Sequence, residues 1–171
     1  TNNKNLANRA RSLRMYGTKG EYYSYESGYN SRLDEIHAAI LLWKLSRIES
    51  YIKKRGKIVK RYDNGLQNTS LNLPTPSPNT RHVWHLYVVR HPKRDLLLKF
   101  LGKDGISLAI HYKHALHLQQ AYDYLGYHQG DFPVAEEACN TVLSLPLYPE
   151  LPRDNQERII EGLTKLLRKL Q

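Results

Sequence analysis

The stretch GYNSRLDEIHAAIL, residues 28–41, joins a tyrosine-rich loop directly to a long segment in which apolar residues recur at helical spacing. Ser31 is a suitable N-cap, and Asp34 and Glu35 would stand in the first turn of a helix. The first backbone N–H groups of a helix lack partners, and together with the helix dipole they attract anions. The sequence therefore predicts a loop-to-helix junction with an anion site at residues 30–32.

Two helices flank this junction in the prediction. Residues 5–15 place apolar side chains on one side of a helix, and Gly17 would close that helix as a C-cap does. Downstream, apolar residues recur at helical spacing over residues 31–67. We expect one long helix there, bent near Gly56.

Residues 68–171 predict an α/β layer. The proline-rich segment 68–80 is expected to be a connector, because proline lacks the backbone donor that regular elements need. Short β-branched segments then alternate with helical ones, as in a small sheet covered by helices. Strands are expected at 82–90, 106–110 and 142–148, and helices at 93–101 and from Asp154 to the end.

The composition is that of an ordinary soluble protein, with 40% hydrophobic and 25% charged residues. The longest apolar run, residues 38–43, is far too short to span a bilayer. Residues 1–17 hold no apolar secretory core, and the single Cys139 fits a reducing compartment. We expect a cytoplasmic protein that does not associate with membranes.

The net charge of +10 invites a nucleic-acid-binding hypothesis. The lysines and arginines are concentrated in three segments that each resemble an amphipathic helix, so solvated helix faces explain most of them. No RNP-like aromatic pattern or zinc spacing accompanies the charge. A basic nucleic-acid-binding module remains the weakest of the alternatives.

Residue types alone do not predict a reaction. His111, His114 and His117 are spaced by three and could approach one metal ion from a helix. However, no carboxylate or cysteine follows at ligand spacing, and His111 is expected to end a strand. Cys139 lies in a predicted helix, where a structural thiol is the better interpretation.

The loop itself is unusual, because four of the thirteen tyrosines fall at positions 22, 23, 25 and 29. Amphipathic rings suit a wet interface or a sugar-sized pocket, and they also serve simply to pack a loop.

The quoted stretch resembles the signature of the DegT family of pyridoxal-phosphate-dependent nucleotide-sugar aminotransferases, in which Gly-x-Asn-x-Arg precedes a helix beginning Leu-Asp-Glu. Further matches follow in the family's order along the whole chain: TNNKNLANRARSLRMYG, HVWHLYVVR, IHY, HLQQAYDYLGY, GDFPVAE and LSLPLYPELP. The resemblance is to enzymes that aminate the 3-keto position of thymidine-diphosphate deoxysugars. It implies the C-terminal part of a fold type I enzyme, with a small sheet, packed helices and one long helix.

The resemblance also implies an absence. In this family the Schiff-base lysine, the aspartate facing the pyridine nitrogen and the aromatic residue stacked on the ring all precede the point that matches Thr1. Pyridoxal phosphate (PLP) chemistry depends on that lysine and that carboxylate. The chain is therefore expected to be the C-terminal half of an enzyme whose full-length parent uses PLP, and to be inactive alone.

Site residues follow from the resemblance position by position. Asn30 matches the asparagine that reaches across a homodimer interface to the cofactor phosphate of the neighbouring subunit. Arg32 matches the arginine beside it, where ion pairing that shapes the turn competes with ligand contact. Tyr22 falls in the loop that approaches the sugar, while His111 and Tyr112 match a His-Tyr pair in the substrate pocket.

The implied domains are residues 1–30 as the end of the cofactor domain with its active-site loop, 31–67 as a connecting helix and 68–171 as the small domain. The implied substrates are a keto-deoxysugar nucleotide and glutamate, with no role for nucleic acid.

Some positions depart from the family pattern. Lys113 and Ala115 stand where prolines are usual, which makes the identity of the sugar less secure than the enzyme class. His37 replaces a usual glutamine on the helix. The alternative to the enzyme is a lysine-less binding or regulatory subunit.

Overall fold

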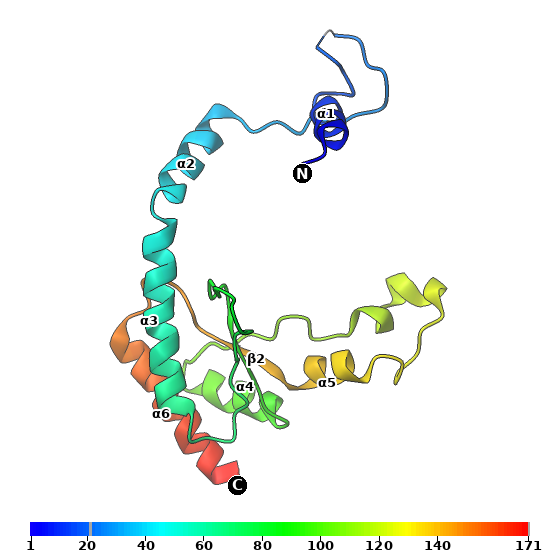
Figure 1. Ribbon diagram of the computed structural model, residues 1–171. Coiled ribbons are helices and arrows are strands. Elements are labelled where there is room, and N and C mark those ends of the chain that lie inside the picture. The colour runs from blue at the N-terminus through cyan, green and yellow to red at the C-terminus, as the bar shows by residue number, and fades with distance from the viewer. Residues whose placement is uncertain (21, 171) are drawn as a thin grey trace. The chain divides into compact units, whose positions relative to one another are not determined.

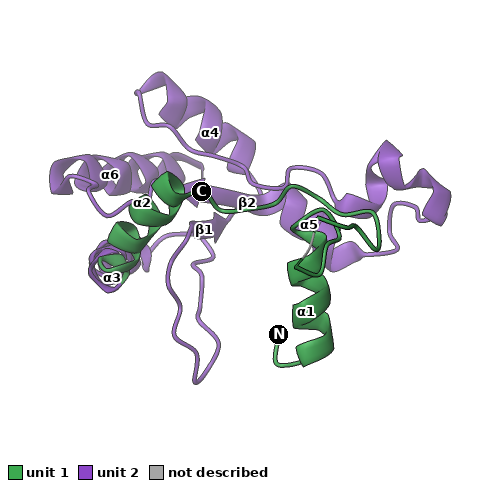
Figure 2. Cartoon of the chain, turned by 90° about the horizontal axis from the view of Figure 1, so that it is seen from above, with its two compact units in different colours: residues 1–48 green, residues 49–171 purple. Residues whose placement is uncertain are grey.

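The computed structural model describes residues 1–20 and 22–170. The chain divides into two compact units, Thr1–Ile48 and Glu49–Gln171, which are called unit 1 and unit 2 below. Figure 2 colours unit 1 green and unit 2 purple. Each unit is described by itself.

Unit 1 begins with helix α1, Lys4–Leu13. Its first turn is capped by the side chain of Asn3, whose oxygen accepts hydrogen bonds from the N–H groups of Asn5 and Leu6. At the other end Gly17 has a φ of +74° and its N–H donates to the carbonyl of Ser12. The helix predicted at residues 5–15, closed by Gly17, is confirmed.

The second helix of unit 1 is α2, Glu35–Leu45, and it begins later than the sequence predicted. Asp34 is its N-cap, because the Asp34 carboxylate accepts the N–H of His37 at 2.9 Å. The predicted N-cap, Ser31, instead donates its N–H to the carbonyl of Arg14. Ser31 therefore belongs to the loop rather than to the helix.

The single long helix predicted at residues 31–67 is also wrong in its continuity. Helix α2 stops at Leu45, and α3, Ile48–Leu66, starts after a turn at Ser46 and Arg47. The Oγ of Ser46 donates to the carbonyl of Trp43 and so competes with the backbone ladder. Helix α3 continues through Gly56, so the bend expected there is absent, and the helix is interrupted at Ser46 and Arg47 instead.

Unit 2 is built on a two-stranded antiparallel sheet of β1, Tyr87–Arg90, and β2, Val142–Leu145, with Tyr87 opposite Leu145. The predicted small sheet exists, but all three predicted strands differ in extent, and the one expected at 142–148 ends at Leu145. The strand predicted at 82–90 begins only at Tyr87, because Trp84 has a φ of 55° and is therefore not extended. Residues 106–110 contribute only an isolated bridge between Ala109 and Ser144.

Helices α3, α4 (Arg94–Lys103) and α6 (Arg153–Leu170) pack with this sheet around one core (Figure 1). The predicted stripe on the last helix is confirmed, because Ile159, Leu163 and Leu167 are all buried. The core side chains of the three helices and two strands are Ile58, Val59, Tyr62, Leu66, Tyr87, Val89, Leu97, Leu101, Leu143, Leu145, Ile159, Leu163 and Leu167.

Three buried polar side chains of this core donate hydrogen bonds, although the Oε1 of Gln156 has no partner within the described residues. The rings of Tyr62 and Tyr87 stack with centroids 5.0 Å apart. The Tyr62 hydroxyl donates to the carbonyl of Pro146, and the Tyr87 hydroxyl donates to Asp63 at 2.7 Å. Burial raises the pKa of both tyrosines, so both rings stay neutral donors. In α6 the buried Gln156 donates to the carbonyl of Ile58 and joins α6 to α3.

A long segment leaves the sheet after Ile110 and returns through α5, Pro133–Thr141 (Figure 1). It contains two short 3-10 helices, η1 (Leu116–Leu118) and η2 (Gln120–Leu125). Cys139 lies in α5, as expected, and is half-buried. Across the described residues, no helix combines the length and apolarity needed to cross a membrane.

Candidate functional site

Residues 16–29 form a closed loop whose two ends are joined by the backbone. The N–H of Tyr16 donates to the carbonyl of Tyr29 at 3.0 Å, and the N–H of Ser31 donates to the carbonyl of Arg14 at the same distance. These bonds form the neck of the loop. Side chains at the neck therefore keep a defined position, although the loop lies on the surface.

The neck depends on two glycines that pass very close to each other. A Cβ atom on Gly28 would lie 2.1 Å from the nitrogen of Gly17 and 2.5 Å from the carbonyl carbon of Tyr16. No side chain fits in that space. The Gly of the Gly-Tyr-Asn sequence is thus required for the loop to close.

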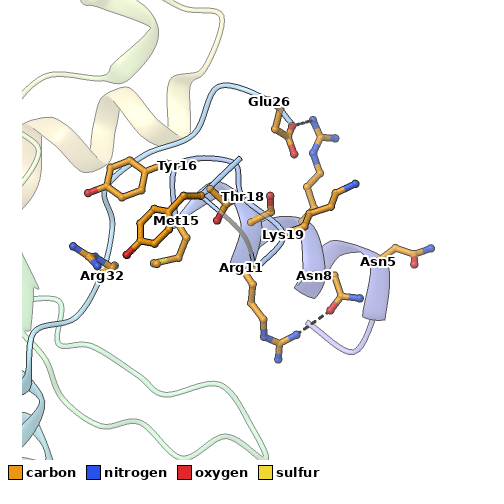
Figure 3. Close-up of a pocket in the computed structure, with 13 residues that line it drawn as sticks. Asn5, Asn8, Arg11, Met15, Tyr16, Thr18, Lys19, Glu26 and Arg32 are labelled. Atoms are coloured by element: carbon orange, nitrogen blue, oxygen red, sulfur yellow. Dashed lines mark hydrogen bonds and ion pairs between the residues drawn. The ribbon is translucent and has the colours of Figure 1, made fainter. Parts of the chain in front are cut away.

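A hollow of about 960 Å³ lies between the polar face of α1 and this loop (Figure 3). Among the residues that the structure describes, four cationic side chains and one carboxylate line it, and this balance favours an anion. The lining residues are Asn5, Asn8, Arg9, Arg11 and Ser12 of α1, then Met15, Tyr16, Thr18, Lys19, Gly20, Tyr22 and Glu26, and finally Arg32.

Some of these polar groups already have partners. Arg9 pairs with Glu26 at 3.3 Å, and Arg11 donates to the side chain of Asn8 at 3.2 Å (Figure 3). The buried Oγ of Ser12 has no hydrogen-bond partner within residues 1–20 and 22–170. A buried hydroxyl without a partner is unfavourable, so Ser12 costs unit 1 some stability.

Asn30 and Arg32 are joined at the edge of this hollow. The Nε of Arg32 donates to the Oδ1 of Asn30 at 3.2 Å. The Arg32 guanidinium carbon also lies 5.9 Å from the centre of the Tyr16 ring, within cation–π range. Asn30 itself forms a backbone bridge with Met15 at the neck.

The predicted anion site assumed free backbone N–H groups at the N-terminus of the long helix, and this assumption is wrong. The Asp34 carboxylate already occupies the first N–H groups of α2, and its hydrogen bond to the N–H of His37 lowers the pKa of Asp34. Glu35 adds a second negative charge in the first turn. An anion at residues 30–32 would have to be held by side chains rather than by the helix dipole.

The five predicted site residues lie in two groups. Asn30, Arg32 and Tyr22 belong to unit 1, where Tyr22 lines the hollow and is fully exposed. His111 and Tyr112 belong to unit 2.

In unit 2, the Nδ1 of His111 lies 2.8 Å from the Oγ of Ser144, beside a second hollow of about 470 Å³. Tyr112 is exposed and has a φ of 61°.

The three histidines of residues 111–117 do not share one site. The Nε2 of His117 lies 3.0 Å from Glu136 of α5, whereas His111 faces Ser144 of β2. The same Glu136 oxygen accepts the N–H of Gly130 at 2.8 Å, and this bond is the main reason why the pKa of Glu136 is lowered. Within the described residues, no cluster of three or more His, Cys, Asp or Glu side chains could hold a metal ion.

The sequence analysis missed the polar face of α1. Asn5, Asn8, Arg9 and Ser12 recur at spacings of three and four, which is the helical signature of one shared face. Only the apolar face of the same helix was used for prediction. The signal was present, but nothing local indicated that the loop would fold back over that face.

Comparison with protein families gives a match between residues 1–164 and the DegT/DnrJ/EryC1/StrS aminotransferase family. A dTDP-3-amino-3,4,6-trideoxy-alpha-D-glucose transaminase from Micromonospora megalomicea is 40% identical over 98% of this chain and 46% of its own length. A pleiotropic regulatory protein from Geobacillus stearothermophilus is 39% identical over the same shares. The predicted family is confirmed.

Among solved structures, DesV of Streptomyces venezuelae in complex with a ketimine intermediate superposes with a TM-score of 0.93 at 37% identity. The superposition covers 98% of this chain and 45% of DesV. The predicted fold class, an α/β part of a fold type I PLP enzyme, is confirmed. The chain spans slightly less than half the length of the curated relatives it matches.

Proposed function

Because the chain belongs to the DegT/DnrJ/EryC1/StrS aminotransferase family, we propose that it is the C-terminal part of an enzyme that transfers an amino group to a nucleotide-linked keto sugar. Glutamate is the proposed amino donor. The observation that carries this proposal is the similarity over nearly the whole chain to transaminases named for dTDP-3-amino sugars. "Full-length enzyme" below means this chain together with the upstream part that its relatives have.

The cofactor of the family is pyridoxal phosphate. When bound, it supplies an electron sink for the carbon that exchanges its amino group. The residues of unit 1 fit its phosphate, because the Asn30 amide can donate and the neighbouring hollow is cationic. In the proposed homodimer, Asn30 donates to the cofactor phosphate held by the second subunit.

The sugar nucleotide contacts the remaining predicted residues in this proposal. Tyr22 presents an exposed ring and hydroxyl, which suit a sugar and its hydroxyl groups. Arg32 contributes a positive charge beside the hollow. His111 is oriented by Ser144 and lies next to the exposed Tyr112, so both could reach a substrate at the surface of unit 2.

The proposed division of labour follows the predicted domains. Residues 1–30 complete the cofactor domain, 31–67 connect the domains and 68–171 form the small domain. The Schiff-base lysine and the aspartate facing the pyridine nitrogen belong to the upstream part of the full-length enzyme. The present chain supplies binding groups, and without that lysine it does not transaminate.

The direct test is Asn30→Ala in the full-length enzyme. We expect the dissociation constant for PLP to rise at least about tenfold, because a hydrogen bond to a charged phosphate contributes roughly 1.5–3 kcal/mol and each 1.4 kcal/mol is about tenfold. Asn68→Ala, an exposed asparagine in unit 2, is the matched control. Unchanged PLP affinity in Asn30→Ala would refute the phosphate role.

Amino transfer itself is tested separately with the unmodified full-length enzyme. Glutamate and a dTDP-linked 3-keto deoxysugar should yield 2-oxoglutarate and the amino sugar. A UDP-linked keto sugar is the comparison substrate, since it changes the base and sugar but keeps the diphosphate. If neither nucleotide yields an amino sugar, the proposed reaction is wrong.

A second candidate is a lysine-less binding or regulatory subunit, favoured by the name of the Geobacillus relative. The intact mass of the protein purified from its source separates the two. A mass near 19.9 kDa would support the subunit, whereas a mass about twice as large matches the length of the relatives and supports the enzyme.

A further inference from the structure

We propose that Arg32 is a positioning residue that fixes the Asn30 amide with its two N–H donors directed away from Arg32 and toward the ligand. The proposal rests on the proposed function, because it assumes that the ligand of Asn30 is the cofactor phosphate. It adds that Arg32 makes no contact with the cofactor phosphate, while its positive charge stays beside the hollow, where the proposed function places the sugar nucleotide. Arg32 acts through Asn30.

The chemistry of the contact decides the orientation of the amide. A guanidinium group can only donate hydrogen bonds, whereas an amide has one accepting and one donating end. The atom that faces the Arg32 Nε at 3.2 Å must therefore be the Asn30 oxygen. The Nδ2 end of Asn30 then points the other way, which is the orientation that a phosphate requires.

Both partners are held in place by the closed neck. Asn30 bridges Met15 through the backbone, and Ser31 donates its N–H to the carbonyl of Arg14. Residues two apart in an extended segment face the same side, which brings Arg32 next to Asn30. The contact therefore arises from the backbone path and does not need a ligand to form it.

The Tyr16 ring supports the guanidinium from its other side. The Arg32 guanidinium carbon lies 5.9 Å from the ring centre, and Figure 3 shows the two side chains together at the edge of the hollow. Tyr16 is itself fixed by its bond to Tyr29 and by a φ of 60°. Both ends of the Arg32 side chain are thus anchored.

The alternative role for Arg32 is direct charge pairing with the phosphate. In that case its Nε contact to Asn30 would be incidental, and any long cation at position 32 would serve. The two roles predict different results for Arg32→Lys, because lysine keeps the charge but has a methylene group at the place of Nε. That substitution removes the donor to Asn30 and the planar group beside Tyr16 but keeps the positive charge.

The test is a double-mutant cycle on the PLP dissociation constant of the full-length enzyme, with Asn30→Ala, Arg32→Lys and the double variant. We expect Asn30→Ala to weaken PLP binding at least about tenfold and Arg32→Lys about fivefold. The double variant should be within about twofold of Asn30→Ala, because Arg32 has nothing to orient once the amide is gone.

A second readout distinguishes positioning from general support of the loop. The phosphorus-31 resonance of the bound cofactor reports hydrogen bonding to the phosphate, and both single variants should shift it in the same direction. The thermal unfolding midpoint should stay unchanged. Arg153→Lys is the matched control, because the Nε of this exposed arginine donates to Glu157 at 2.7 Å outside the candidate site.

The outcomes separate the two proposals. If Arg32→Lys keeps full PLP affinity, or if the losses in the double variant multiply, Arg32 does not act through Asn30 and this inference is overturned while the phosphate role stands. If Asn30→Ala itself keeps full affinity, the phosphate role is overturned and the inference with it. Should Arg32→Lys fold poorly, Arg32→Met gives the same cycle with a neutral side chain of similar length.

Discussion

Unit 2 buries a continuous hydrophobic core, whereas unit 1 buries no hydrophobic side chain among its described residues. The difference is not one of composition. Helix α2 carries Ile36, Ile40, Leu41, Leu42, Trp43 and Leu45, and every one of them is exposed. The apolar residues of α6 lie on one stripe and are buried, while those of α2 surround the helix.

The comparison teaches that the two units are ordered by different forces. Unit 2 is stabilised by removal of apolar surface from water, at about 25 cal/mol per Å². Unit 1 is ordered by caps and by the backbone hydrogen bonds of the loop neck, each worth only about 1 kcal/mol net. The candidate cofactor contact lies in unit 1, where these caps and backbone hydrogen bonds hold the loop.

The largest effect is expected from a core deletion in unit 2. Leu163→Ala removes a fully buried side chain and should lower the free energy of unfolding by about 2–5 kcal/mol. Leu42→Ala in α2 removes a side chain that is 68% exposed and should change it by less than about 0.5 kcal/mol. Urea unfolding followed by circular dichroism measures both. Similar losses in the two variants would contradict the contrast between the units.

The next effect is expected at Arg55 of unit 2. Its Nη1 donates to the carbonyls of Trp84, His85 and Leu147, and so fixes the turn before β1 to the end of β2. Arg55→Met should cost about 1–3 kcal/mol, because half-buried carbonyls lose a charged donor. Urea unfolding is again the measurement.

Lys57→Met, an exposed cation two residues further along α3, is the control for Arg55→Met. An equal loss in the two variants would mean that charge on α3, rather than these three bonds, stabilises unit 2.

A local effect of about 1–3 kcal/mol is expected from Gly28→Ala in unit 1, because the new methyl group would overlap the backbone of Gly17. The loop neck should open while unit 2 keeps its stability. Hydrogen exchange measures this outcome directly: the amides of Tyr16 and Tyr29 should lose protection, and those of α6 should not.

Gly56→Ala in α3 is the opposite case, since nothing lies within 4 Å of its Cβ position. Alanine is the better helix former by roughly 0.5–1 kcal/mol, so this variant should stabilise unit 2 slightly. For the Gly28→Ala variant, the contradicting result would be amide exchange at Tyr16 that is as slow as in the unmodified chain, or slower. That result would show that the neck does not depend on the close approach of Gly17 and Gly28.

The smallest effect is a pH dependence confined to unit 2. His91 is buried, its Nδ1 accepts the N–H of Lys93 and its Nε2 lies 3.2 Å from Ser70. Burial, with a contribution from Lys93, lowers the pKa of His91 below 6.5. A lowered pKa in the folded state stabilises the protein above about pH 6.5, and this contribution is lost as the pH falls.

The measurement is the urea midpoint at pH 7.5 and pH 5.5 for the unmodified chain and for His91→Gln, which does not titrate. The unmodified chain should lose more stability on acidification than the variant. Identical pH dependence in both would assign the titration to another group.

Much of the fold was predictable because its signals are local. Helices α1 and α6 were found from apolar spacing, and the stripe of Ile159, Leu163 and Leu167 is buried as its period requires. Strand β2 was found from its β-branched and apolar run. These patterns report hydrogen bonds and faces within one element, so no knowledge of distant residues was needed.

The errors fall where distant residues compete. Ser31 is a good N-cap by type, but its N–H is used by Arg14 at the other end of the loop. Residues 106–110 are good strand formers, yet only Ala109 pairs with β2. In the candidate site, too, the local signature indicated Asn30 and Arg32. It did not indicate the polar face of α1, which lies elsewhere in the sequence.

The sequence by itself determined the family, the amphipathic helices and the residue types of the Gly-Tyr-Asn-Ser-Arg turn, since all of these are encoded within short windows. Only the tertiary structure decided that Gly28 must pass against Gly17, that Asp34 rather than Ser31 caps α2, and that Arg32 donates to the oxygen of Asn30. The physical reason is that closure of the loop brings Gly28 against Gly17 and holds Ser31 to Arg14 across the intervening chain, whereas residue type alone does not decide which local side-chain contacts form beside the closed neck.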